Sequence, residues 1–318
     1  MRVGQNPAKY VKDVAKPERI TVAVLNYIPF LSGFYSDLLE VLKACLGSIL
    51  ESTDLPYDLL VFDNGSCDEV RQYLLDQHAE GNIQYLVFSQ KNLGKGGAWN
   101  VILAGVPGEL VAYTDNDCYF HRGWLSRSLE ILETFPRVGM VTARPFRTNP
   151  DFYSASVEWG EQTPGVHVER GQFIPWEVFK EFDLSLGQSE EEIRDHYEKT
   201  QDVRITYRQV QAIAGASHWQ FLARKEVLQQ FLPFSMDRPM GQVKQLDQRM
   251  NQAGYLRLMP TEPLAMNMSN TLRNMPGLVS AHAERAARRK ISKFWDFPPL
   301  KRGLLSVYDW IFRLYYDR

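Results

Sequence analysis

Strand-like and helix-like segments alternate four times between residues 20 and 142, and this alternation limits the possible folds more than any other feature of the sequence. The strand-like segments are short and rich in apolar and β-branched residues, whereas the helix-like segments repeat apolar residues every three or four positions. The expected strands are 20–26, 58–62 (ending at Asp63), 83–88, 110–114 and 138–142, and the expected helices lie at 38–50, around 70–74, at 95–104 and at 124–135. This pattern predicts right-handed crossovers and an α/β fold, with a mostly parallel sheet covered by helices on both faces.

Polar side chains stand where several of these strands are expected to end. They are Asn26, Asp63, Asn64, Asp115 and Asp117. Ligands of open α/β sheets bind beyond the carboxyl ends of the strands, and neighbouring parallel strands end at the same edge. The sequence therefore predicts that these residues converge on a single site.

Two carboxylates, Asp115 and Asp117, end the apolar run that begins at residue 109. If the strand continued through them, both side chains would point to the same face, because side chains alternate along an extended chain. Two adjacent negative charges repel each other, and a Mg²⁺ or Mn²⁺ ion bound together with a phosphate removes that repulsion. A polar turn is the simpler interpretation of an isolated Asp-x-Asp, but the motifs nearby favour a metal site.

Those motifs are an Asp-Asn-Gly-Ser sequence that starts at Asp63 and a glycine-rich stretch from Asn92 to Asn100. The Asp63 carboxylate could accept a hydrogen bond from a nucleotide base, and the alternative is an ordinary turn. In the second stretch, glycines allow the backbone to approach a ligand closely, a helix N-terminus favours anions, and Lys95 adds a positive charge suited to a diphosphate. The alternative there is close helix–strand packing at small residues.

Composition excludes several classes of protein. A formal net charge of −2 argues against nucleic acid as the main partner. No segment approaches the ~18 apolar residues that a membrane span requires, and the polar N-terminus lacks the apolar core of a signal peptide. Cys45, Cys67 and Cys118 suggest neither a disulfide framework nor a paired metal site. A cytoplasmic location is therefore expected.

The domain organisation follows from where the alternation stops. We expect an N-terminal extension at 1–19, a catalytic domain at 20–270 that contains a partly helical insertion at 149–209, and a helical C-terminal arm at 271–318. Between His282 and Arg302, seven basic residues outnumber two acidic ones and aromatic residues are interleaved. Such an arm suits peripheral contact with an anionic inner-membrane surface, and packing on its own domain or on a second subunit is the alternative.

The order of these motifs resembles family 2 glycosyltransferases of the GT-A (Rossmann-like) fold. The shared features are an early strand ending at Asn26, the FDNGS sequence, an Asn-x-Gly-x-x-x-Ala-x-Asn pattern starting at Asn92, and the TDND sequence. The resemblance covers roughly 20–145 well and extends more loosely to 215–224 and 246–258. Each motif is degenerate, but the ordered set is specific.

The resemblance implies a nucleotide-diphosphosugar donor, with a UDP-sugar favoured, and Mn²⁺ or Mg²⁺ as cofactor. By analogy, Asp63 would contact the base, and the Asn92–Gly97 stretch, including Gly94 and Lys95, would contact the nucleotide. Asn26 and Asn64 are further candidates for binding the nucleotide donor. Asp115 lies near the ribose or the metal, and Asp117 binds the metal directly. The acceptor, a glycan or a lipid-linked precursor, would attack the anomeric carbon from the opposite face.

The general base is less clearly marked. Family members usually place a Glu-Asp pair at the start of a helix ahead of a Gly-Tyr pair, but this chain has Gln242 and Val243 at the corresponding positions. Asp247 is therefore the candidate base, and an ordinary exposed helix carboxylate is the alternative.

Three further residues bear on the metal and acceptor sides of the expected site. Some relatives carry a metal-binding His after this helix, where the present chain has Asn267. The metal site would then have one protein ligand fewer, or its metal dependence would differ. His218 and Trp219 are candidates for acceptor contact, and a buried, hydrogen-bonded histidine is the equal alternative.

We expect a metal-dependent, inverting glycosyltransferase, and surface polysaccharide or glycolipid synthesis is a suitable context. A sugar nucleotidyltransferase would need a glycine- and arginine-containing loop after the first strand, which 25–36 lacks. The absent Glu-Asp pair leaves a non-catalytic sugar-nucleotide-binding or assembly subunit as the alternative.

Overall fold

The computed structural model describes residues 4–238, 241 and 243–272. All of them belong to the first of two units of the chain, Met1–Asn274. The predicted C-terminal arm lies outside the described residues, apart from Thr271 and Leu272.

The strands and helices expected before residue 142 are present, with small shifts at their ends. Their bounds are β1 (Ile20–Asn26), α1 (Leu38–Ser52), β2 (Asp58–Asp63), α2 (Asp68–Ala79), β3 (Tyr85–Phe88), α3 (Gly94–Gly105), β4 (Leu110–Asp115), α4 (Trp124–Thr134) and β6 (Val138–Val141). The sequence did not predict the short strand β5 (Cys118–Phe120) or the 3₁₀ turn η2 (Gly33–Tyr35).

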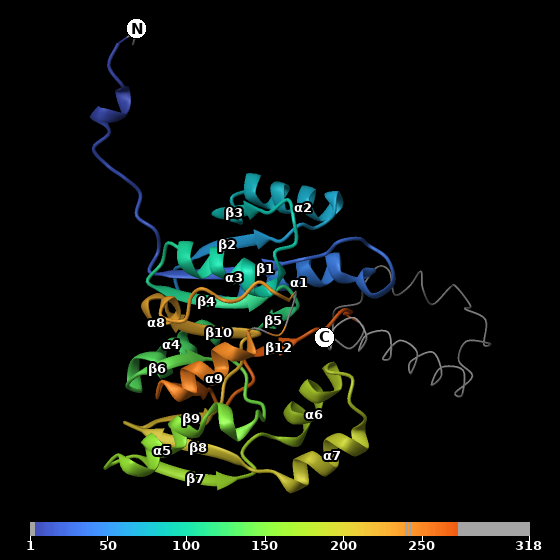
Figure 1. The fold of residues 1–318 in the computed structure, drawn as a ribbon, viewed down its shortest axis with the longest axis vertical. Helices are drawn as coiled ribbons and strands as arrows, with labels where there is room; N and C mark the ends of the chain where they lie inside the picture. Colours follow the sequence, from blue (N-terminus) through green and yellow to red (C-terminus); the bar gives the residue numbers. More distant parts are fainter. Residues whose placement is uncertain (1–3, 239–240, 242, 273–318) are drawn as a thin grey trace, which may run out of the picture. The chain divides into compact units, whose positions relative to one another are not determined.

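These strands form one half of a large sheet, and the second half of the chain completes it. Its order is β3-β2-β1-β4-β10-β6-β11-β9-β8-β7, which Figure 1 shows edge to edge. The later strands are β7 (His167–Gly171), β8 (Asp202–Tyr207), β9 (Val210–Ala214), β10 (Gln220–Arg224) and β11 (Leu256–Met259). Strands β10, β9 and β7 run opposite to the others. The predicted mostly parallel α/β sheet is therefore confirmed.

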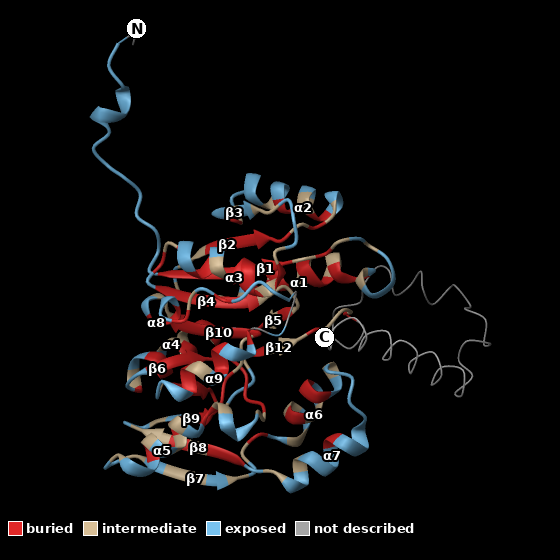
Figure 2. Cartoon of the chain, in the orientation of Figure 1, coloured by how far each residue is buried: buried red, intermediate tan, exposed pale blue. Residues whose placement is uncertain are grey.

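Both faces of the central strands are covered. Every residue of β1 is buried, and Figure 2 shows the same for the middle of the sheet. On one face Trp99 of α3 contacts the ring of Tyr113 of β4 at 5.0 Å between centroids, and Tyr113 stacks on Phe221 of β10 at 5.2 Å. The helices α8 (Lys225–Gln229) and α9 (Lys244–Gln252) add side chains to the same cluster. Burial on both faces explains why these strands read as continuous apolar runs.

The expected insertion at 149–209 is partly helical, as predicted, but it also extends the sheet. It contains η3 (Pro150–Phe152), α5 (Ser154–Gln162), α6 (Trp176–Ser185) and α7 (Glu190–Lys199), together with β7 and β8. The β8–β9 hairpin turns through Arg208 and Gln209, which both have positive φ, as a two-residue turn of this twist requires. Neither is Gly, Asn or Asp, so this position carries no turn signal in the sequence.

Residues 4–19 contribute no buried side chain and contain one 3₁₀ turn, η1 (Pro7–Tyr10). No helix of the described chain is both long and apolar enough to span a bilayer. A small second sheet pairs β12 (Ala265–Asn267) with β5.

Candidate functional site

The carboxyl ends of β1 and β2 are joined by a buried network of polar side chains. The Asn26 amide donates to Asp63 Oδ1 at 2.8 Å and to Ser66 Oγ at 3.0 Å, and its own oxygen accepts from the Asn116 amide at 2.7 Å. Asp63 Oδ2 accepts from the Ser66 backbone N–H at 3.1 Å. The network thus holds the ends of β1 and β2 and the turn after β4 in one arrangement.

A second set of contacts connects the turn after β2 to the glycine-rich stretch. The Asn64 amide donates to Asn92 Oδ1 at 3.0 Å, and Asn64 Oδ1 accepts from the Leu93 N–H at 2.9 Å. Asn92 Oδ1 also accepts from the Gly94 N–H at 2.8 Å. Asn64 and Asn92 therefore fix the start of α3, and the predicted nucleotide-binding residues of both motifs lie together.

The glycines of this region have different roles. Gly65 adopts a φ of +91°, and a Cβ there would lie 3.1 Å from the Asn92 nitrogen, so only glycine fits without displacing the neighbouring turn. At Gly97 a Cβ would meet Leu93 and Met236 side-chain atoms at 2.9 and 2.8 Å. The close-packing interpretation therefore accounts for Gly97.

Asp115, the last residue of β4, is held by two neighbours. Its Oδ2 pairs with Lys95 Nζ at 2.6 Å, and its Oδ1 accepts from the Tyr113 hydroxyl at 2.6 Å. Burial and the adjacent carboxylate raise the pKa of Tyr113, so this phenol remains a hydrogen-bond donor. Lys95 Nζ also lies 5.7 Å from the ring centres of Trp99 and Tyr113. The cation predicted to meet a diphosphate therefore lies directly beside the first carboxylate of the pair.

Asp117 lies in a turn, because β4 ends at Asp115 and β5 begins at Cys118. The strand does not continue through Asp117, so the alternation of side chains along a strand does not put the two carboxylates on one face. The two remain close enough to interact: burial, and then the negative charge of Asp115, raise the pKa of Asp117 to about 7, and Lys95 opposes this rise. The uncompensated negative charge at this turn suits a cation.

The Asp115–Asp117 turn is therefore a candidate metal site of limited protein coordination. Among the described residues, no three His, Cys, Asp or Glu side chains gather into a group that could hold a metal ion. Mg²⁺ is commonly bound by one or two carboxylates together with substrate phosphates, so the donor set fits a metal that arrives with a nucleotide. Asn267 lies opposite Cys118 in the β12–β5 pair, next to this turn, and its side-chain oxygen accepts from the Ser269 N–H at 2.7 Å.

A second polar cluster centres on Asp247 of α9. One oxygen of Asp247 accepts from the Arg257 guanidinium, and the other lies 2.6 Å from His218 Nδ1. The Arg257 guanidinium also donates to the Ala216 carbonyl, and at 2.6 Å to the Phe152 carbonyl. Arg257 has no exposed side-chain surface, and burial lowers its pKa, which the pairing with Asp247 opposes. Asp247 is 3% exposed, so it is not the ordinary exposed helix carboxylate that was the alternative.

The two clusters are connected through the edge where β10 pairs with β4. Gln220 of β10 lies opposite Thr114 of β4, and the Asp115 N–H donates to the Trp219 carbonyl at 2.9 Å. Because β10 runs antiparallel to β4, its first residues lie at the carboxyl end of β4. His218 is therefore one residue from a backbone contact of Asp115.

Comparison with known proteins places the chain in a family. The sequence pattern of Glycosyl transferase family 2 matches residues 34–228, which is more than half of the chain. The chain belongs to Glycosyl transferase family 2. The match contains the residues from Asp63 to Asp117, whereas Asn26 and Asp247 lie outside it. A curated relative, an uncharacterized glycosyltransferase of Nostoc sp. (strain PCC 7120), is 27% identical over 123 residues, which are 39% of this chain and 35% of that protein.

Solved structures confirm the GT-A fold. The mannosyltransferase PcManGT from Pyrobaculum calidifontis, in complex with GDP-Man and Mn²⁺, superposes with a TM-score of 0.50 at 18% identity, covering 86% of this chain and 61% of that one. GalNAc-T7 with UDP, GalNAc and Mn²⁺ also gives 0.50, at 10% identity, covering 79% of this chain and 44% of that one. The chain thus spans about a third of the curated relative and no more than about three fifths of these two structures.

Four residues of the two clusters were not predicted from the sequence. Ser66 and Asn116 complete the network around Asn26, Tyr113 bonds Asp115, and Arg257 bonds Asp247. Two carried a signal: Tyr113 stands two residues before Asp115 on the same strand, and Arg257 interrupts an otherwise apolar buried strand. A buried charge requires a partner, so an arginine in such a strand indicates a buried carboxylate nearby.

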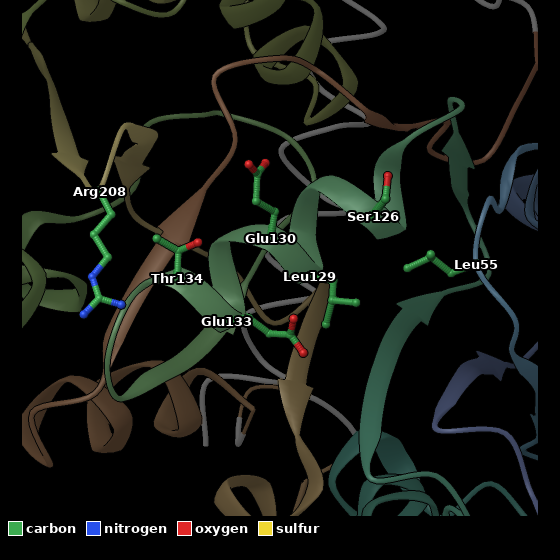
Figure 3. Close-up of a pocket in the computed structure, with 7 residues that line it drawn as sticks. All are labelled: Leu55, Ser126, Leu129, Glu130, Glu133, Thr134 and Arg208. Atoms are coloured by element: carbon green, nitrogen blue, oxygen red, sulfur yellow. The ribbon is translucent and has the colours of Figure 1, made fainter.

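One open hollow of the described surface lies elsewhere. Its volume is about 510 Å³, and it is lined by Leu55, Ser126, Leu129, Glu130, Glu133, Thr134 and Arg208. Figure 3 shows that most of these side chains project from one helix, α4. Glu133 pairs with Arg19, which precedes β1, so this hollow extends toward the amino ends of the strands. It is therefore separate from the candidate site at the carboxyl ends.

Replacing Lys95 by Met is expected to weaken nucleotide-sugar binding. The variant keeps the length of the side chain but removes the cation beside Asp115, and a hydrogen bond to a charged group contributes roughly 1.5–3 kcal/mol, which corresponds to about 10- to 100-fold in affinity. Titration calorimetry with a nucleoside diphosphate and Mn²⁺ measures the change. Lys91→Met, on the exposed start of the same stretch, is the matched control. Equal affinities for the two variants would exclude a role for Lys95 in donor binding.

Proposed function

We propose that the protein is a metal-dependent glycosyltransferase that moves a sugar from a nucleotide-diphosphosugar to an acceptor hydroxyl with inversion at the anomeric carbon. The observation that carries this proposal is the convergence of Asp63, Lys95, Asp115 and Asp117 at one edge of the sheet. Ligands of such sheets bind at this edge, and the four side chains supply the donors and acceptors that a nucleotide diphosphate requires.

In this proposal Asp63 recognises the base. A carboxylate offers about four acceptor positions, and Asn26 and Ser66 use two of them. Asp63 has no exposed surface, so an imide or amine N–H of the base would reach the remaining positions only where the neighbouring side chains move aside. The network around Asn26 holds the carboxylate in a fixed orientation, and Asn64 and Asn92 position the glycine-rich turn against the nucleotide.

The diphosphate would lie between Lys95 and the Asp115–Asp117 turn. A bound Mn²⁺ or Mg²⁺ held by these two carboxylates would neutralise the charge that develops on the departing diphosphate. Lys95, which pairs with Asp115, would turn toward the same phosphate oxygens. The complexes of PcManGT with GDP-Man and of GalNAc-T7 with UDP, each with Mn²⁺, support this class of donor and cofactor.

The proposed acceptor is a glycan or a lipid-linked glycan precursor, and its hydroxyl would approach from the side of the Asp247 cluster. Asp247 is the carboxylate that we propose takes part in removing the proton from this hydroxyl. Its two bonds, to His218 and Arg257, place it on the same sheet edge as the donor residues.

The test is a thermal-shift screen against UDP-, GDP- and dTDP-sugars, each with and without Mn²⁺, with CMP-sugars as a monophosphate control. A ligand that binds the native state raises the unfolding midpoint by mass action. A Mn²⁺-dependent shift with one diphosphate class, together with release of the nucleoside diphosphate, supports the proposal and identifies the base. Binding without release in the presence of acceptor indicates the non-catalytic alternative, and absence of any shift refutes the donor site.

A further inference from the structure

The Asp247 carboxylate is poorly placed to meet an acceptor directly. Only 3% of its side chain is exposed, and each oxygen already has a partner, Arg257 on one side and His218 on the other. A general base must lie within hydrogen-bond reach of the proton that it removes. An acceptor hydroxyl could bond Asp247 only by displacing one of these two partners.

His218 is the member of this cluster that reaches the surface. Its side chain is 21% exposed, whereas the Arg257 side chain is fully buried behind Asp247. An ionised carboxylate can only accept, so Nδ1 of His218 carries the proton and donates it to Asp247. In the neutral ring Nε2 then has a free lone pair, and no described residue forms a hydrogen bond with it.

The loop that carries His218 is fixed on both sides. The Ala216 carbonyl accepts from Arg257, and the Ser217 N–H donates to the Thr142 hydroxyl at 2.8 Å. Gly215 has a φ of +138°, and a Cβ there would lie 2.7 Å from the Met259 side chain. The imidazole is therefore held by its backbone as well as by Asp247, as a group that must meet a reacting atom requires.

This loop also adjoins the proposed donor site. Trp219, the next residue, accepts through its carbonyl from the Asp115 N–H at 2.9 Å. His218 and the Asp115–Asp117 turn thus lie at one edge of the sheet. An acceptor at the anomeric carbon of a sugar held at that turn would lie beside His218.

We infer that His218 is the catalytic base and that Asp247 is its positioning residue, an assignment that rests on the proposed transfer reaction. The acceptor O–H proton moves to Nε2 of His218 while the acceptor oxygen forms its bond to the anomeric carbon. The bond between that carbon and the diphosphate oxygen breaks, and its electron pair leaves with the diphosphate. Asp247 stabilises the resulting imidazolium, which later returns the proton to water, and Arg257 holds Asp247 in place.

The kinetic experiment compares variants of the 318-residue chain with the nucleotide sugar selected by the thermal-shift screen, with water as acceptor. His218→Ala should lower the rate of nucleoside diphosphate release by about 10²- to 10⁴-fold, while nucleotide affinity stays within about two-fold. Added imidazole should restore part of the lost rate. In Asp247→Asn the rate of nucleoside diphosphate release should fall less than in His218→Ala, and added imidazole should not raise it. His167→Ala, an exposed histidine on β7, is the control and should match the wild-type protein.

A second measurement does not depend on turnover. In ¹⁵N-histidine-labelled protein, the ring signals that disappear in His218→Ala belong to His218. At neutral pH we expect its Nδ1 to carry hydrogen and its Nε2 to carry none. The opposite tautomer would overturn the assignment, because Nε2 could then not accept a proton.

The outcomes separate this inference from the proposed function. A wild-type protein that binds no nucleotide sugar refutes the proposed function. A protein that binds and turns over donor, but keeps most of its rate in His218→Ala or shows no recovery with imidazole, refutes the assignment of His218 alone. A greater loss in Asp247→Asn than in His218→Ala would return the base role to the carboxylate.

Discussion

Asp117→Asn is expected to abolish Mn²⁺-dependent binding of the nucleotide sugar while the domain remains folded. The substitution keeps the size of the side chain but replaces a carboxylate, which is a strong ligand for a hard cation, by a neutral amide. Among the described residues, no three His, Cys, Asp or Glu side chains form a group that could hold a metal ion, so no ready-made set of protein ligands would compensate. The thermal shift that Mn²⁺ and nucleotide produce together in the wild-type protein should therefore disappear.

The control is the stability of both proteins without metal. There we expect Asp117→Asn to be more stable than the wild-type protein, although it loses the stabilisation by Mn²⁺ and nucleotide. Because the pKa of Asp117 is raised to about 7, the native protein binds this proton more tightly than the unfolded chain does. The stability of the metal-free wild-type protein should therefore fall as pH rises from about 4 to about 7. The variant has no ionisable group at this position, so it should not show this loss of stability. With EDTA at pH 8, Asp117→Asn should be the more stable protein by at least about 1 kcal/mol, a gap that closes toward pH 4.

Two results would contradict the role of Asp117. One is a Mn²⁺-dependent shift of wild-type size in Asp117→Asn. The other is an equal loss in Asp195→Asn, which changes an exposed carboxylate on α7 and should leave both the metal response and the stability unchanged.

Arg257→Met is expected to produce the largest loss of stability of any single substitution at the site. The guanidinium is fully buried and bonds Asp247, the Ala216 carbonyl and the Phe152 carbonyl. Removing one partner of a buried ion pair leaves the other charge uncompensated, which costs about 3–5 kcal/mol. Chemical denaturation in urea measures this change as a lower midpoint.

A second substitution tests whether the unpaired charge of Asp247 causes the loss of stability in Arg257→Met. Arg257→Met combined with Asp247→Asn removes both charges, so the double variant should be more stable than Arg257→Met alone. Arg170→Met breaks an exposed pair with Glu161 and should cost less than about 1 kcal/mol. If Arg257→Met behaved like Arg170→Met, the bridge from Arg257 to the His218 loop would not be a structural requirement.

The first half of the fold and the donor side of the site could be predicted from the sequence, because local patterns encode them. Fully buried strands read as apolar runs, and their polar ends mark the sheet edge. Asp63 and Asp115 are therefore predicted at one edge of the sheet, and the structure has them there, with Lys95 of the glycine-rich stretch paired to Asp115. The sequence left open whether the strand continues through Asp117, because an alternating pattern does not reveal where pairing stops, and the structure ends β4 at Asp115.

The second half could be predicted less well, because its contacts are distant in sequence. Arg257 and the loop at 215–219 meet Asp247 only when β10 and β11 have entered the sheet. The strand β8 was not predicted because the turn that joins it to β9, Arg208–Gln209, contains none of the usual turn residues. Its partner β7 precedes it by the whole segment that holds α6 and α7, so no local pattern connects these two strands. His218 was selected as a candidate, but its partner Asp247 was chosen separately, and no spacing rule connects the two.

The antiparallel strand β10 has a consequence for how this protein is synthesised. It fills the position between β4 and β6, although more than a hundred residues separate the end of β4 at Asp115 from its start at Gln220. During translation the inner edges of β4 and β6 therefore emerge unpaired and must wait for the chain that closes them, and unpaired strand edges are prone to aggregation. The nascent chain would need protection during that interval, and the two clusters of the site would come together in the same late step that completes the sheet.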